Sequence, residues 1–98
     1  MSRGISAFDV IEAAHAYRKV SGALANTYED SGYRAVAIAP DKVTITYNGA
    51  PVRVEIIGMD LRGVIRSVRF DSNKRAIYEI DLDNLDTWVA RQEEIKLL

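Results

Sequence analysis

The early part of the chain carries a stripe of mostly apolar positions at spacings of three and four residues, which is the period of an α-helix. The stripe consists of Phe8, Ile11, Ala14, Tyr17, Ser21, Leu24 and Tyr28. Ser6 and Asp9 form a weaker version of a capping box, with Ile5 and Val10 at the staple positions. The glycine of Asp30-Ser31-Gly32 provides a left-handed cap near the other end. This pattern predicts a long helix that packs against a sheet.

Residues 33 to 81 are instead typical of strands joined by turns. The Pro40-Asp41 turn predicts the pairs Ala39–Lys42, Ile38–Val43 and Val36–Ile45. The Asn48-Gly49 turn, a strong hairpin signal, predicts Tyr47–Ala50, Ile45–Val52, Val43–Val54 and Lys42–Glu55. Both turns place the same side chains on one face of the sheet. We therefore predict six buried residues: Val36, Ile38, Val43, Ile45, Val52 and Val54.

Two more strands are predicted at 64–70 and 76–80, with Val68 and Phe70 matched to Ala76, Tyr78 and Ile80. Arg66 falls on the core face of the first of these strands, where an unpaired charge is costly. This position indicates a bulge, an exposed strand end, or a partner such as Glu79.

A second helix is predicted from Asp83 or Asn84 onwards, with Asp86 in its first turn and cations towards its end. Its inward stripe comprises Leu85, Trp88, Val89, Gln92 and Ile95. The element order α-β-β-β-β-β-α predicts a single α+β domain, residues 1–98. In it, an antiparallel sheet of about five strands packs one face on the N-terminal helix, and the C-terminal helix returns over the sheet or its edge.

Composition agrees with one globular domain: the 98 residues are 48% hydrophobic and 28% charged. The chain has no cysteine, which excludes disulfides and thiolate chemistry. It also lacks a signal-peptide core and any apolar run of membrane-spanning length. We therefore expect a soluble cytoplasmic protein that does not act at a membrane.

The sequence offers little catalytic equipment. Phosphate-loop, dinucleotide-binding, nucleophile-elbow and HExxH motifs are all absent. His15 is the only histidine, and charged neighbours at helical spacing indicate an exposed residue without a role. The acidic run of Glu79, Asp81, Asp83 and Asp86 does not fit a calcium loop and is attributed to a strand end before a helix. We expect no enzyme activity, no cofactor, no metal and no small-molecule substrate.

Charge is unevenly distributed, since residues 31–75 hold eight basic and four acidic groups and residues 76–98 hold two basic and six acidic groups. We expect the two segments to neutralise one another in part. The basic segment supports one alternative function, nucleic-acid binding. Its residues would be Arg53, Arg62, Arg66, Arg69, Lys74 and Arg75. Tyr47 and Phe70 align with the core face, which removes the aromatic platform that such proteins use.

The sheet face opposite the core mixes isoleucines with long charged residues, and the loop 58–63 adds two apolar residues and an arginine between glycines. The predicted face comprises Ala35, Ala37, Thr44, Thr46, Arg53, Glu55, Ile57, Ile65, Ser67, Arg69, Ile77 and Glu79. The predicted partner-binding residues are Ile57, Met59, Leu61, Arg62, Ile65, Arg69 and Ile77.

This surface favours a small non-catalytic protein-binding module that covers a partner protein or a second copy of itself as a homodimer. By analogy alone, inhibitors, immunity proteins and phage-encoded antagonists act in this way. The competing interpretation is that the C-terminal helix covers the same face within the monomer.

Overall fold

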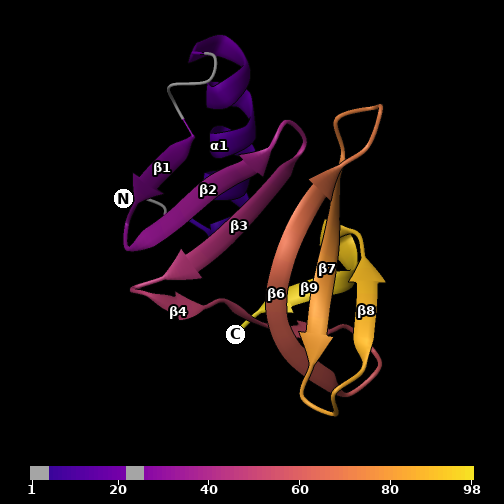
Figure 1. The fold of residues 1–98 in the computed structure, drawn as a ribbon. Helices are drawn as coiled ribbons and strands as arrows, with labels where there is room; N and C mark the ends of the chain where they lie inside the picture. The colour runs from indigo at the N-terminus through magenta and orange to yellow at the C-terminus, as the bar shows by residue number, and fades with distance from the viewer. Residues whose placement is uncertain (1–4, 22–25) are drawn as a thin grey trace.

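A computed structural model describes residues 5–21 and 26–98. Within them lie one α-helix, α1 (Ala7–Ser21), a short 3₁₀ helix, η2 (Gln92–Glu94), and an antiparallel sheet of nine strands (Figure 1). The strands are β1 (Thr27–Asp30), β2 (Tyr33–Ala39), β3 (Lys42–Tyr47), β4 (Ala50–Pro51), β5 (Arg53–Ile56), β6 (Leu61–Phe70), β7 (Ala76–Leu82), β8 (Thr87–Ala90) and β9 (Ile95–Leu97). The α+β class is confirmed, but the predicted number of five strands is wrong.

Strand β6 is the longest strand and connects the two wings of the sheet. One of its edges pairs with β5 near its start and with β3 near its end, and the other edge pairs with β7. Figure 1 shows β1, β2 and β3 as one wing, with α1 against it, and β6, β7 and β8 as the other. Gly63 lies where β6 runs between β5 and β7, and a Cβ there would lie 2.8 Å from Leu82 Cα. A side chain does not fit at this crossing.

The start of α1 is as predicted. The Ser6 hydroxyl accepts the Asp9 N–H (3.3 Å), and the Asp9 carboxylate accepts the Ser6 N–H (3.1 Å), which satisfies free amides of the first turn. The stripe is buried at Ile11 and Ala14. The side chains of Tyr17 and Ser21, and the whole of Leu24, lie outside the part of the chain that the structure describes.

The extension of the helix towards Asp30 is wrong, because Thr27–Asp30 is strand β1. Ser31 and Gly32 both have positive φ (54° and 89°) and form a two-residue turn between β1 and β2. A left-handed glycine serves equally well as a helix cap and in a hairpin turn, so the sequence signal was ambiguous.

The β2–β3 hairpin contains a bulge that the turn did not predict. Ala39 pairs with Lys42 as expected, but the register shifts at Ile38, so that Ala37 pairs with Val43 and Ala35 with Ile45. Because a one-residue shift exchanges the two faces of a strand, Ile38 is 56% exposed and the two alanines are buried. Val36 is only half-buried. The other four predicted core residues are confirmed as buried: Val43, Ile45, Val52 and Val54.

The β3–β4 hairpin is cut short at Pro51. Tyr47 pairs with Ala50 as predicted, but the proposed pairs Ile45–Val52, Val43–Val54 and Lys42–Glu55 do not form. Instead Val43 pairs with Val68, Lys42 with Arg69, Val54 with Gly63 and Glu55 with Arg62. Proline has no N–H to continue the hydrogen-bond ladder with β3. The chain after Pro51 forms β5, which pairs with β6 instead.

The predicted register of β6 and β7 is confirmed, with Val68 opposite Tyr78 and Phe70 opposite Ala76. Of the three alternatives for Arg66, the bulge is present, between Ile65 and Ser67. Arg66 is exposed and pairs with Asp81 (2.7 Å), not with Glu79.

The predicted C-terminal helix is wrong: the segment forms β8, η2 and β9. The Asn84 side chain accepts the Asp86 N–H (3.0 Å), and the Leu82 N–H donates to the Asp86 C=O (2.8 Å), which closes a hairpin turn. Asn and Asp favour such turns as much as helix starts, and Thr, Trp and Val favour the strand that follows. Consequently Leu85 and Val89 are exposed instead of being buried against the sheet.

Candidate functional site

The seven predicted partner-binding residues do not form one exposed surface. Ile57 and Met59 are exposed in the turn between β5 and β6, and the first two residues of β6 are Leu61, which is half-buried, and Arg62, which is exposed. Ile65 is buried, because the bulge at Arg66 turns it inward, so its place on the outer face is a wrong prediction. Arg69 and Ile77 lie opposite each other on β6 and β7, away from the turn.

The turn between β7 and β8 lies beside the β5–β6 turn. The Asp83 N–H donates to the Arg62 C=O (2.8 Å), and the two turns line a hollow of about 390 Å³ between them. Three large apolar side chains are exposed on these turns: Ile57 (57%), Met59 (50%) and Leu85 (94%). We call these three residues the apolar end. The sequence predicted two of them and placed the third inside a helix.

Leu85 combines two unfavourable features. It has a left-handed backbone (φ 75°), which costs a residue with a Cβ about 1 kcal/mol, and its side chain is almost entirely in water. Glycine or asparagine would suit this position better in a protein selected only for stability.

The arginines proposed for nucleic-acid binding are mostly neutralised by acidic residues of the last segment. Ion pairs join the two segments at Arg53–Asp83 (2.9 Å), Arg66–Asp81 (2.7 Å), Arg69–Glu79 (3.3 Å), Lys42–Glu79 (3.7 Å), Arg75–Glu93 (3.3 Å) and Asp71–Arg91 (2.9 Å). The Arg53 guanidinium lowers the pKa of Asp83, and the Ser67 hydroxyl, followed by Arg69, lowers that of Glu79. The expected neutralisation of the two segments therefore occurs pair by pair.

His15 is not the exposed residue that its helical neighbours predicted. It is only 6% exposed, its ring stacks on Phe70 with centroids 3.8 Å apart, and its Nε2 lies 2.9 Å from the Asp41 carboxylate. The Asp41 carbonyl in turn accepts the Phe70 N–H (2.9 Å). His15 thus fastens α1 to the β2–β3 turn and to the end of β6.

A second exposed surface surrounds two neighbouring turns, Ser31-Gly32 and Asn48-Gly49. All four residues have positive φ, as expected for tight hairpin turns whose twist matches the strands. The Asn48 N–H donates to the Gly32 C=O (2.8 Å), and a Cβ on Gly32 would lie 2.8 Å from Asn48 Oδ1 and 3.0 Å from the Tyr47 ring. Close packing therefore fixes the two turns to each other.

Two tyrosines next to these turns separate two hollows. Tyr33 and Tyr47 are cross-strand neighbours with ring centroids 4.6 Å apart and planes at 48°. A polar hollow of about 550 Å³ lies on one side of them, and an apolar groove of about 420 Å³ on the other, with Tyr33 lining both. We call this surface, with its two tyrosines and two hollows, the twin-turn site.

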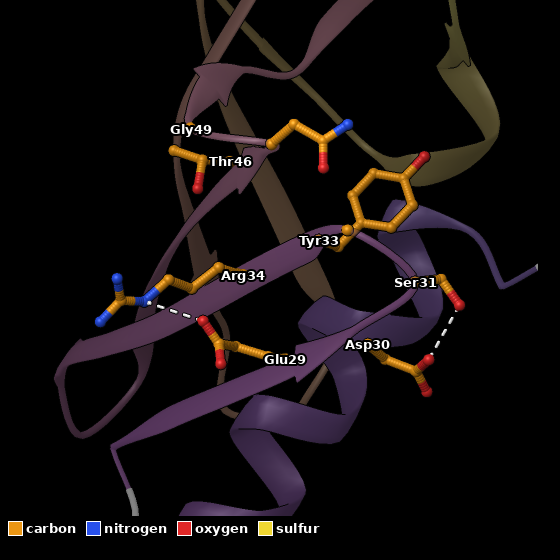
Figure 2. A pocket seen from close by; sticks show the side chains of 9 residues that line it. Glu29, Asp30, Ser31, Tyr33, Arg34, Thr46 and Gly49 are labelled. Carbon is orange, nitrogen blue, oxygen red and sulfur yellow. Dashed lines mark hydrogen bonds and ion pairs between the residues drawn. The ribbon is translucent and has the colours of Figure 1, made fainter.

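The polar hollow holds two carboxylates and one guanidinium. Figure 2 shows the Glu29–Arg34 ion pair (3.5 Å) at one side of it and the hydrogen bond from the Ser31 hydroxyl to Asp30 (2.8 Å) at the other. Glu29, Arg34 and Thr46 follow one another across the strands β1, β2 and β3.

The apolar groove begins at the two tyrosines and is lined further by Ala50, Pro51, Val52, Arg53, Leu97 and Leu98. The hairpin pattern did not predict this site because it places Tyr47 on the core face, whereas Tyr47 is 45% exposed. The signal in the sequence that could have predicted the site is the position of Tyr33 and Tyr47 directly beside the Ser31-Gly32 and Asn48-Gly49 turns.

Within the described residues, no cluster of three or more metal-ligating side chains occurs, and no helix has the length and apolar character that crossing a membrane requires. Comparison with protein-family models, with curated proteins and with solved structures found no match for this chain.

Proposed function

We propose that this chain is a non-catalytic protein-binding domain that contacts its partner through the apolar end, Ile57, Met59 and Leu85. The observation that carries the proposal is Leu85, a leucine that is 94% exposed on a left-handed backbone. Strained backbone and exposed apolar side chains both lower stability, and such features concentrate at functional sites. Burial of Leu85 in a partner would recover the free energy that the isolated chain forgoes.

The surroundings of the apolar end resemble the rim of a protein interface. Asp60, Arg62 and Asp83 line the hollow beside the apolar residues, and interfaces typically place an apolar centre inside such a polar rim. The acidic residues disfavour an anionic membrane as the partner surface. The nucleic-acid alternative has less support, because carboxylates engage four of its six basic residues, Arg53, Arg66, Arg69 and Arg75.

The test compares Leu85→Gly with Ile38→Ser, a control at an exposed apolar residue outside the apolar end. Glycine relieves the left-handed strain, so we expect the thermal stability of Leu85→Gly to be unchanged or higher, while partner capture falls about tenfold or more. Ile38→Ser should capture the partner as the unchanged chain does. Affinity capture from a lysate of the expressing cells, followed by quantitative mass spectrometry, measures the first effect.

Sedimentation of the purified chain decides whether the partner is a second copy. Self-association that Leu85→Gly abolishes identifies a homodimer, and a monomer that captures another chain identifies a different protein. If Leu85→Gly combined with Met59→Ser keeps both the oligomeric state and every captured partner, the apolar end is not the interface.

A further inference from the structure

The twin-turn site has the features of a preformed peptide groove. Its apolar part is bounded by the faces of Tyr33 and Tyr47 and by Pro51, and the polar hollow with Glu29 and Asp30 continues from it past Tyr33. A ligand that occupies both hollows must therefore present an apolar part next to a polar one. The site lies on different turns from the apolar end and does not depend on the function proposed for it.

The site is held rigid before any ligand arrives. The bond between Asn48 and Gly32 ties the two turns together, and the Tyr47 ring rests against Gly32 with no room for a methyl group between them. Rigid aromatic side chains lose little conformational entropy on binding, which favours affinity from a small contact area.

We propose that the twin-turn site binds an extended, proline-containing peptide segment of a partner protein, with a basic side chain of that peptide in the polar hollow. Proline-rich segments keep an extended conformation and pack against aromatic-lined grooves, and the tyrosines and Pro51 provide such a lining.

Charge complementarity favours a basic residue in the bound peptide. Asp30 lies on the same sheet face as Tyr33 and Tyr47, whereas Glu29 pairs with Arg34 on the opposite face, so the carboxylate on the face of the tyrosines repels an anionic ligand and attracts a cationic one.

The experiment measures fluorescence anisotropy with a labelled synthetic peptide of alternating prolines and leucines that ends in one arginine. Two control peptides replace the arginine with glutamate or every proline with alanine. We expect the parent peptide to bind about tenfold more tightly than either control. Equal binding of all three peptides, or no binding at millimolar concentration, overturns the proposal.

Variants of the chain locate the binding. Tyr47→Ser is expected to weaken binding about tenfold or more, and Tyr47→Phe to preserve it because the ring remains. The double variant Glu29→Gln with Asp30→Asn should weaken binding roughly threefold, and Glu12→Gln, at an exposed position of α1 outside the site, should not. Unchanged binding by both Tyr47→Ser and the double variant contradicts the assignment.

Two further measurements keep the outcome interpretable. If Tyr47→Ser melts at a lower temperature than the unchanged chain, its weaker binding could reflect unfolding. In that case the amide chemical shifts of the unchanged chain locate the binding, and on peptide addition they should move at residues 31–34 and 47–50. Leu85→Gly should bind the peptide normally, so that failure at this site and failure at the apolar end are told apart. Shifts confined to the apolar end would show that the peptide binds there instead.

Discussion

At the scale of single residues, Tyr78 carries a polar atom that the fold leaves unsatisfied. Its side chain is fully buried beside Phe8, and its hydroxyl has no hydrogen-bond partner among the described residues. Burial raises the pKa of Tyr78 far above its ordinary value of 10.0. Because a buried hydroxyl without a partner is unfavourable, Tyr78→Phe should raise the free energy of unfolding by about 1 kcal/mol. Urea denaturation checks this, and a loss of stability would contradict it.

His15 has a structural role that its sequence neighbours hide. His15→Ala removes the stacking on Phe70 and the hydrogen bond to Asp41, and it leaves a gap between α1 and β6. We expect the free energy of unfolding to fall by about 2 kcal/mol. Glu12→Ala, at an exposed position of the same helix, is the control and should change it by less than about 0.5 kcal/mol. Equal stability of the two variants would restore the interpretation of His15 as a solvent-exposed residue.

At the scale of elements, the β6–β7 loop is organised by one carboxylate. Asp71 accepts the N–H groups of Asn73 (2.9 Å) and Arg75 (3.0 Å) and the guanidinium of Arg91 (2.9 Å). The Arg75 N–H, followed by Arg91, lowers the pKa of Asp71 below its ordinary value of 3.8. A group whose pKa is lowered by folding stabilises the fold above its unfolded pKa, and this stabilisation is lost as the pH falls through the folded value.

Asp71→Asn should therefore be less stable than the unchanged chain at neutral pH, and this difference should shrink below about pH 4. Denaturation midpoints measured from neutral to acid pH show the effect. Ser72→Ala, in the same exposed loop, is a control that should keep the original pH dependence. A difference for Asp71→Asn that is the same at every pH would mean that its ionisation does not hold the loop.

Elements whose signals are local were predictable, and those that depend on distant partners were not. The Ser6 cap and the Asn48-Gly49 turn follow from a few adjacent residues and are confirmed, and the bulge at Arg66 is one of the three alternatives that its charge indicated. The bulge at Ile38 and the passage of the chain from β3 to β6 after Pro51 depend on what packs against these strands.

The prediction of a helix in the C-terminal segment was wrong for a related reason. Asn84 and Asp86 satisfy the rules for a helix start and for a turn, and only the available pairing edge of β7 decides between them. The twin-turn site was missed in the same way, since it joins two turns that are distant in the sequence.

At the scale of the whole molecule, we expect the ion pairs between the two segments to oppose nucleic-acid binding. Arg53, Arg66 and Arg75 each face a carboxylate, and the formal net charge is −1. With its arginines engaged, the chain should bind duplex DNA with a Kd weaker than about 10⁻⁴ M at physiological salt.

Removal of three carboxylates tests this account of the surface. The triple variant Asp81→Asn, Asp83→Asn and Glu93→Gln releases those arginines and changes the formal net charge from −1 to +2, because three negative charges are lost. We expect its affinity for a labelled DNA duplex, measured by fluorescence anisotropy, to rise about tenfold and to fall again steeply with added salt. A control variant that loses three carboxylates with no arginine ion pair among the described residues, Asp30→Asn, Asp60→Asn and Asp86→Asn, separates release of the arginines from the change in net charge and should gain less. If the unchanged chain already binds the duplex tightly with a steep salt dependence, the arginines are accessible despite their pairs, and nucleic-acid binding becomes the better account of the function.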